Sequence, residues 1–395
     1  MTKTASLRGV AALLGIVLLL VACGDGGQAQ GESAEADPTA GTDAPTTGEA
    51  TASPEEVAAE PFPVTFAFVG QAVSPLAANF TAGIELGYYE EEGIGPVEII
   101  AMSDFAAQTA ALGSGDVQLA VGSPTFMLNQ AASGEEQPGI AYYAYTYPFK
   151  YDWAVAPDSE IQSASELAGM TVGVDDLGRI APIIAEALLE DAGVEYDSVS
   201  VIATGGGVTG GQALEAGEID VMLADDTMLG QWEVAGIDYR LLERPEEVPL
   251  IGSFYIATTQ ELMDERPDVV IGFARAVAKG SVFVSENLEC GAAIFLKQFP
   301  QAAPQGASTE EAIDDIATIV GKRAPLWSPE NIGESQWGVT IPEMWAAEVQ
   351  YQGIEAEEEL YADLYTNEFI EEINDFDVEA VREAAQACDP SEYAD

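Results

Sequence analysis

The chain has 395 residues, of which 68 are Asp or Glu and 13 are Lys or Arg, and its formal net charge is −55. A field of that sign excludes nucleic acid as a partner and opposes adhesion to anionic lipid. The chain contains no His, so the commonest general base and the commonest metal ligand are both missing. No metal or cofactor is therefore expected.

The N-terminus has the pattern of an export signal. Lys3 and Arg8 precede an apolar run over residues 10–21, which is too short to span a bilayer as a stable helix. The run ends in LVAC at 20–23, and this ending resembles the lipobox of bacterial lipoproteins. The resemblance implies that residues 1–22 are a signal peptide and that a lipid on Cys23 makes the only membrane contact. An ordinary signal or anchor with an incidental Cys is the alternative.

Residues 23–61 are predicted to form a disordered acidic tether. The segment after Cys23 is rich in Gly, Ala, Thr and Pro, contains nine acidic residues and has Val57 as its single large aliphatic residue. Such a composition cannot bury enough apolar surface to offset the entropy lost on ordering. The folded part therefore begins near Phe62, and its length suits two domains.

Apolar runs and helical segments alternate along the first part of the folded region. Residues 64–70, rich in β-branched and aromatic side chains, predict a buried strand, and Ser123-Pro124 predicts a helix start. Strands that alternate with helices predict a mainly parallel sheet covered on both faces. The expected elements are strands at 64–70, 97–101, 118–122 and 139–145, and helices at 75–92, at 104–112 and from 123.

The same alternation restarts after about residue 157. A short capped helix is expected at 163–167, and the residue pattern from 260 to 395 predicts helices almost throughout. Between them we expect strands at 170–176, 199–205, 221–225 and 239–243, and helices at 180–192, 211–216 and 227–235.

The chain also repeats one of its own patterns. Shifted by 102 positions, residues 97–125 fall on residues 199–227 without a gap, so that ALGSGDVQLAVGSPT matches ALEAGEIDVMLADDT. Two similar lobes would produce this echo. The alternative is the general likeness of any two strand–helix–strand units.

The glycine-rich stretch TGGGVTGG at 204–211 does not fit a phosphate-binding Walker loop, because no Lys followed by Ser or Thr completes it. We expect its glycines, Gly206 among them, to allow a tight turn and a close approach of the backbone to a ligand.

Four motifs in order resemble the solute-binding proteins of ABC importers, most closely the group for sulfonates, nitrate, taurine and the pyrimidine precursor of thiamine. The resemblance covers roughly 62–258, and the helical remainder fits more loosely. The motifs are GIELGYYEEEGIGPVEII, AALGSGDVQLAVGSPT, IQSASELAGMTVGVDD and ALEAGEIDVMLAD.

This resemblance implies a two-lobed α/β fold of the periplasmic-binding-protein type II, in which two doubly wound lobes are joined by a two-strand hinge. Residues 62–157 would form the first part of lobe 1, residues 158–247 lobe 2, and residues 248–395 the hinge return and a helical completion of lobe 1. The hinge would lie at 153–157 and 252–258.

The family also implies a function and partners. It predicts an extracytoplasmic, lipid-anchored monomer that captures a small molecule and delivers it to a permease and ATPase complex. An enzyme on the same fold and a surface sensor are the alternatives from other classes.

Ligands of open α/β sheets bind beyond the carboxyl ends of the strands. This rule selects a set of candidate ligand-binding residues from both lobes, namely Gln71, Ser103, Ser123, Thr125, Asp175, Asp176, Arg179, Gly206, Asp225 and Thr227.

An aromatic run at 143–153 places Tyr, Phe or Trp at every second position. If the run is extended, all six rings share one face. We expect Tyr145 and Tyr147 to stack on a planar ligand. The alternative is a strand that packs its rings into lobe 1 or the hinge.

Four acids and one Arg at the strand ends of lobe 2 favour a planar nitrogenous ligand, such as a pyrimidine precursor of thiamine. The alternative ligand is an anion of the sulfonate, nitrate or taurine type. It would bind to Arg179, Ser123 and Thr125.

Two cysteines remain in the folded part, Cys290 and Cys388. An even pair in an exported, oxidising compartment favours a disulfide, which would tie the helical C-terminal region together. Two free thiols are the alternative.

Overall fold

The structure of the protein, a computed structural model, describes residues 60–135, 137–177, 180–244, 249–354 and 358–394. The predicted signal peptide, Cys23, most of the predicted tether and Arg179 lie outside these ranges. Within them, no helix has the length and apolar character needed to cross a membrane.

The first sheet has the strand order β2-β1-β3-β10-β4. Strand β1 (Phe62–Val69) pairs in parallel with β2 (Ile94–Met102) and β3 (Leu119–Gly122). Strand β10 (Phe254–Thr259) returns from much later in the chain and lies antiparallel to β3 and to β4 (Gly139–Thr146).

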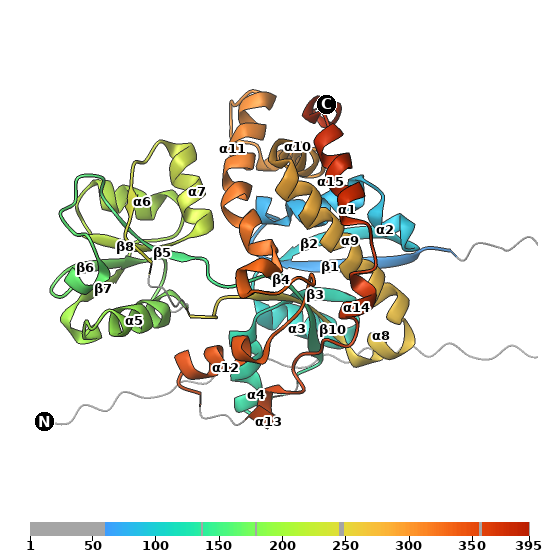
Figure 1. Ribbon diagram of the computed structural model, residues 1–395, viewed down its shortest axis with the longest axis horizontal. Coiled ribbons are helices and arrows are strands. Elements are labelled where there is room, and N and C mark those ends of the chain that lie inside the picture. The colour runs from blue at the N-terminus through green and yellow to red at the C-terminus, as the bar shows by residue number, and fades with distance from the viewer. Residues whose placement is uncertain (1–59, 136, 178–179, 245–248, 355–357, 395) are drawn as a thin grey trace, which may run out of the picture. The chain divides into compact units, whose positions relative to one another are not determined.

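The second sheet repeats this plan in the order β7-β6-β8-β5-β9. Strand β6 (Thr171–Val174) pairs in parallel with β7 (Ser200–Ala203) and β8 (Val221–Asp225). Strand β5 (Tyr151–Val155) is antiparallel to β8 and to β9 (Arg240–Leu241). Figure 1 shows the two sheets with their helices.

The helices next to the two sheets have the following bounds. Those of the first sheet are α1 (Ala78–Glu85), α2 (Tyr88–Glu91), α3 (Phe105–Ser114) and α4 (Pro124–Ala132). Those of the second sheet are α5 (Ala181–Asp191), α6 (Val208–Glu215) and α7 (Asp226–Ala235).

The internal echo of the sequence is a structural repeat. A shift of 102 positions places β2, α3, β3 and α4 on β7, α6, β8 and α7. In the first sheet the two repeated strands flank β1, and in the second they flank β6; in both sheets an antiparallel strand comes next in the order. The expectation of two similar α/β lobes is therefore confirmed.

Local chemistry sets the helix ends. Asp104 and Asp225 each accept a hydrogen bond from a backbone N–H of the first turn, of α3 and α7 respectively. The helix expected at 75–92 is instead divided between a 3₁₀ turn at Pro75–Ala77, α1 and α2. The interruption falls at Gly87, whose φ of +76° is incompatible with a continuous helix.

The chain crosses between the sheets earlier than the sequence indicates. Strand β5 belongs to the second sheet, so the first crossing lies between Thr146 and Tyr151, and the residues 153–157 expected in the hinge are mainly strand. The return crossing lies between Leu241 and Phe254. The crossing is early because β5 pairs with both β8 and β9 and so becomes part of the second sheet.

The aromatic run is divided by this crossing and does not form a single face. Tyr143 and Tyr145 pack in the core of the first sheet, and Tyr147 belongs to a smaller neighbouring cluster. The last three rings, Phe149, Tyr151 and Trp153, lie in the core of the second sheet.

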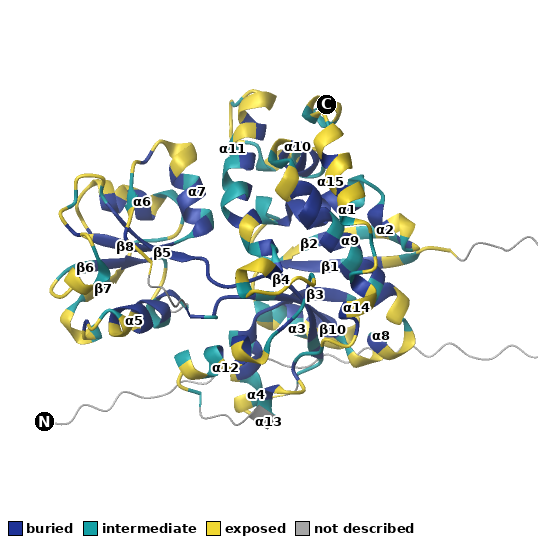
Figure 2. Cartoon of the chain, viewed as in Figure 1, coloured by how far each residue is buried: buried dark blue, intermediate teal, exposed yellow. Residues whose placement is uncertain are grey.

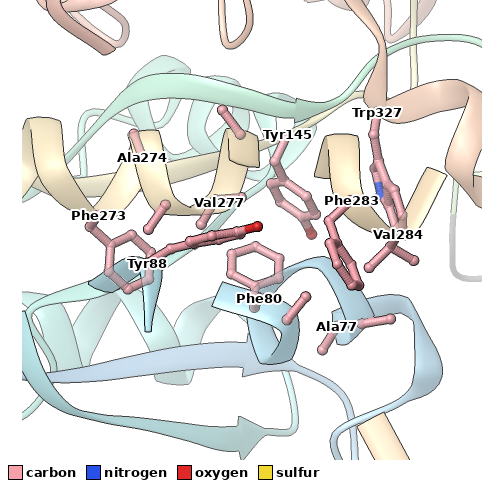
Figure 3. Packing of buried hydrophobic residues seen from close by; sticks show 14 of the residues in the cluster. Ala77, Phe80, Tyr88, Tyr145, Phe273, Ala274, Val277, Phe283, Val284 and Trp327 are labelled. Atoms are coloured by element: carbon pink, nitrogen blue, oxygen red, sulfur yellow. The ribbon is translucent and has the colours of Figure 1, made fainter. Parts of the chain in front are cut away.

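The C-terminal region is helical, as expected, and completes the first core. Long helices α9 (Pro267–Glu286) and α10 (Leu288–Gln298) supply many of its buried residues, and Figure 3 shows part of this packing. Figure 2 shows buried residues along the strands and exposed residues on the outer sides of the helices. The other helices here are α8 (Gln260–Glu265), α11 (Thr309–Arg323), α12 (Pro342–Tyr351), α13 (Glu358–Tyr361), α14 (Ile370–Ile373) and α15 (Val378–Ala387).

A disulfide closes this region. Cys290 in α10 and Cys388, which follows α15, are bonded with an S–S distance of 1.99 Å. The bond holds the last helix against α9 and α10, and Val381 and Ala385 of that helix are buried in the first core.

Candidate functional site

A cavity of about 530 Å³ is lined by residues from both sheets. Its walls come from residues that end or follow strands β1, β2, β3, β6 and β8, and from both crossing segments. This is the position at which open α/β sheets bind ligands. The lining residues used below are Ser103, Phe105, Ser123, Thr125, Phe126, Lys150, Tyr151, Asp175, Asp225, Gly252, Ser253, Phe254 and Gln352.

Five of the residues predicted from the strand ends lie in this lining. Ser103, Ser123 and Thr125 approach from the first sheet, and Asp175 and Asp225 approach from the second. The strand-end rule therefore selected five residues that line the cavity, from both sheets, without any knowledge of the packing.

Ser123 and Asp225 occupy equivalent positions in the two repeats, and each is the N-cap residue of a helix. The Asp225 carboxylate accepts a hydrogen bond from the Met228 amide at 2.8 Å, whereas the Ser123 side chain makes no capping bond. Burial, reinforced by the neighbouring Asp226, raises the pKa of Asp225. The Ser123 hydroxyl therefore remains available to a ligand in the cavity, whereas the Asp225 carboxylate already accepts one hydrogen bond.

Lys150 lies in the first crossing and is buried with its ammonium group at the cavity. Its Nζ is 4.2 Å from the centre of the Phe254 ring and 5.5 Å from that of Tyr151. Burial and the nearby Arg323 lower the pKa of Lys150 to about 8, against opposing effects of Asp225, Asp226 and Glu348. Among the residues that the structure describes, no carboxylate forms a salt bridge with Lys150.

Sequence reasoning missed Lys150, although a signal exists. It is the one basic residue between Arg8 and Arg179, and it sits inside the aromatic run. A single base in so long an acidic stretch, next to rings that are expected to be buried, is unusual because buried Lys is rare without a partner.

Glu348 of α12 forms a buried support behind the cavity wall. Its carboxylate accepts hydrogen bonds from the Gly252 amide at 2.8 Å, the Thr125 hydroxyl at 3.0 Å and the Gln352 side chain at 2.9 Å. Burial raises its pKa despite these bonds. Because all three donors belong to cavity residues, Glu348 positions the start of α4 and the return crossing.

The four acids counted at the strand ends of lobe 2 are not all available to a ligand. Asp226 is buried in an ion pair with Arg323 of α11, with one N–O distance of 2.6 Å. Arg323 is far from these acids in sequence, so it was not included when the charges at the strand ends of lobe 2 were counted. That count therefore overstates the negative charge that faces the cavity.

The two tyrosines expected to stack on a ligand do not face the cavity. Tyr145 is only 4% exposed and packs edge-on against Phe80 in the first core (Figure 3), and Tyr147 is fully buried in another cluster. This position does not fit the stacking role, because rings enclosed within the protein cannot reach a ligand.

Other rings line the cavity in their place. Phe254 stacks on Tyr145 with 6.4 Å between ring centres, and Phe105 lies 6.1 Å from Phe254 and 6.0 Å from Phe126. Tyr145 therefore packs the Phe254 ring against the first core.

The remaining predicted residues lie outside the cavity lining. Gln71, Asp176 and Gly206 are exposed, and Thr227 accepts a hydrogen bond from Arg323 at 3.3 Å. Arg179 lies outside the described residues.

The glycine-rich stretch has a structural role that its sequence only partly indicates. Gly205 and Gly207 have φ values of +84° and +64°, as a tight turn requires. The Gly207 carbonyl accepts a hydrogen bond from the Trp232 indole at 2.9 Å, so the turn is held against α7.

Several solved structures share this fold at low sequence identity. A putative sulfonate-binding protein, SsuA from Methylobacillus flagellatus, is 13% identical, with a TM-score of 0.55 over 80% of this chain and 94% of its own. The alkanesulfonate-binding protein SsuA from Xanthomonas axonopodis pv. citri, solved with MOPS, is 14% identical, with a TM-score of 0.53 over 78% and 99%. A ligand-binding component of an ABC-type import system from Staphylococcus aureus is 12% identical, with a TM-score of 0.54 over 79% and 99%.

These matches establish the two-lobed fold of periplasmic binding proteins. No curated protein sequence is significantly similar to the chain. The family model described as NMT1/THI5 like matches residues 74–288, more than half of the chain. The chain is therefore a member of the NMT1/THI5-like family.

Proposed function

We propose that this protein is the extracytoplasmic solute-binding component of an ABC importer. The observation that carries the proposal is the cavity in which strand ends of both sheets and both crossing segments meet. A ligand held there contacts both lobes at once, so binding favours their closure. The importer components among the solved structures support the same function.

The site supports an organic anion of the sulfonate type best. Lys150 offers a buried ammonium group with no carboxylate partner among the described residues, and Ser123 and Thr125 lie at the N-terminus of α4, where the helix dipole favours negative charge.

A planar nitrogenous compound, such as a pyrimidine precursor of thiamine, is the second candidate. The Phe254 ring and the carboxylates of Asp175 and Asp225 in the cavity lining support it, because rings stack on planar solutes and carboxylates accept from N–H groups.

Native mass spectrometry of the purified protein tests solute capture, since a co-purified molecule identifies the ligand directly. Isothermal titration calorimetry with alkylsulfonates, taurine, nitrate and pyrimidines then ranks the two classes. Binding of one class without chemical turnover is the expected result. Steady-state conversion of the bound molecule would instead indicate an enzyme on this fold.

We further propose that Cys23 anchors the exported protein to the membrane and that a permease and ATPase complex receives the ligand from a monomer. Stable anchoring needs two or more acyl chains. Cys23→Ser should release the protein from membranes or leave it unprocessed. If this variant still fractionates with membranes at the mature size, lipidation at Cys23 is excluded.

A further inference from the structure

Three polar side chains of the cavity lining are largely buried and make no side-chain hydrogen bond or ion pair within the described residues. Lys150, Ser123 and Ser253 are 8%, 7% and 3% exposed, and all three line the cavity. The Ser253 hydroxyl has no hydrogen-bond partner within the described residues. No hydrogen bond or ion pair joins the Lys150 ammonium or the Ser123 hydroxyl to any side chain in the described ranges.

Such groups are costly unless something satisfies them. Buried polar atoms in folded proteins are nearly always hydrogen-bonded, and leaving one unpaired destabilises the fold, more so when the group is charged. The Ser253 hydroxyl is such an atom, and it shares the cavity lining with the Lys150 ammonium and the Ser123 hydroxyl. Together these groups point to a bound partner that supplies acceptors.

The backbone beside them adds further donors. Helix α4 begins at Pro124, which has no N–H, so its first free amides are those of Thr125 and Phe126. The helix dipole at this end favours negative charge. The wall thus combines an ammonium, two hydroxyls and a helix N-terminus, which together match an oxyanion.

The carboxylates whose charge acts on Lys150 already have partners. Asp225 accepts from the Met228 amide, Asp226 pairs with Arg323, and Glu348 accepts three hydrogen bonds. None of them pairs with Lys150 at salt-bridge distance, so the ammonium remains available to a ligand.

On the basis of the proposed solute-binding function, we propose that Lys150 is the residue that selects the charge of the ligand. Its ammonium binds the oxyanion group of an organic solute, a sulfonate or a carboxylate, together with the hydroxyls of Ser253 and Ser123. The remainder of the solute lies against the ring of Phe254, over which the Lys150 ammonium sits.

The positions of these residues link ligand binding to the two crossings. Lys150 precedes β5 in the first crossing, and Ser253 precedes β10 in the second. An oxyanion that contacts both side chains bridges the two segments that connect the lobes.

Affinity for the anion should also depend on pH. The charged groups that face Lys150 are Arg323 on α11, Asp225 on β8, Asp226 on α7 and Glu348 on α12, and with burial they leave a pKa of about 8 for Lys150. Below this value the ammonium is present. Above it the neutral amine loses its attraction for an anion, so binding weakens as pH rises and is coupled to proton uptake.

The test is calorimetric titration of the purified protein with ethanesulfonate, propionate and a pyrimidine at pH 6.5, 7.5 and 9. We expect Lys150→Met to weaken binding of both anions about 10- to 100-fold at pH 6.5, the loss of a hydrogen bond to a charged group. Wild-type affinity should fall at pH 9, with proton uptake visible as a dependence of the enthalpy on the buffer. Lys150→Arg should remove that pH dependence.

Lys322→Met is the matched control, because Lys322 pairs with Glu233 at the surface and lies outside the cavity lining. It should bind as the wild type does, and thermal unfolding checks that each variant is folded. Binding of the pyrimidine alone, or anion binding that Lys150→Met leaves unchanged, overturns the role of Lys150 and leaves solute capture intact. If the wild type binds none of the probes and carries no co-purified solute, both proposals fail.

Discussion

Arg323, the last residue of α11, forms a buried two-point ion pair with Asp226, the first residue of α7. Helix α11 packs into the first core through Ile316 and Val320, whereas α7 belongs to the second sheet's repeat. The pair therefore fastens the C-terminal region to the second lobe, close to the cavity residue Asp225.

Loss of Arg323 should be strongly destabilising. Arg323→Met leaves Asp226 buried without a counter-charge, and breaking such a pair costs about 3–5 kcal/mol. Urea unfolding should show this loss, and adding Asp226→Leu should recover much of it. Lys322→Met, which breaks an exposed pair with Glu233, should cost less than about 1 kcal/mol. Equal effects of the two single variants would contradict a special role for the buried pair.

Lys150 should lower the stability of the ligand-free protein below pH 8. Its pKa falls from 10.5 to about 8 on folding, so between these values the unfolded chain holds a proton that the folded protein lacks. The contribution of Lys150 to stability therefore improves as pH rises from about 8 to 10.5. Lys150→Met should be more stable than the wild type at pH 7, by up to about 3 kcal/mol.

Calorimetric unfolding of both proteins at several pH values measures this difference. The advantage of Lys150→Met should shrink from pH 8 upward, and a constant difference across that range would show that the ammonium is not the cause. A more stable variant with weaker anion binding would separate a ligand-binding role from a structural one.

The aromatic wall should contribute through Phe254 and not through the hydroxyl of Tyr145. Phe254→Leu should weaken ligand binding about 2- to 10-fold, since aromatic contacts are worth about 0.5–1.5 kcal/mol beyond their area. Tyr145→Phe keeps the ring that supports Phe254 and should leave affinity unchanged. Titration with the identified ligand distinguishes the two, and the reverse ranking would restore the stacking role expected from the sequence.

Removal of the disulfide should destabilise the protein without changing its ligand affinity. The bond joins residues separated by 98 positions, and loss of a native disulfide that closes a long loop costs about 2–5 kcal/mol. Neither Cys290 nor Cys388 lines the cavity. The double variant Cys290→Ser, Cys388→Ser should therefore melt earlier but bind as before; an affinity change would mean that the C-terminal helices act on the cavity.

Salt should stabilise the protein. With 68 acidic and 13 basic residues, like-charge repulsion should dominate, and screening shortens its range from about 10 Å at 0.1 M salt to about 3 Å at 1 M. The melting temperature should rise with NaCl between these limits. A flat or falling curve would show that the acids are too well dispersed for repulsion to matter.

The sequence by itself determined the repeated architecture. Hydrophobic periodicity, the helix start at Ser123-Pro124 and the repeat over 102 positions can be read from short segments, and they correctly indicated two α/β lobes and several strand ends that line the cavity. These features are readable because each depends on side chains only a few residues apart.

Tertiary structure alone decided which side chains face the cavity and with what charge. Tyr145 is covered by Phe80, and Asp226 is neutralised by Arg323. Lys150 is buried against Phe254, which lies more than 100 residues further along the chain. Burial and ion pairing depend on segments that meet only after folding, and therefore the pattern around any one residue could not reveal them.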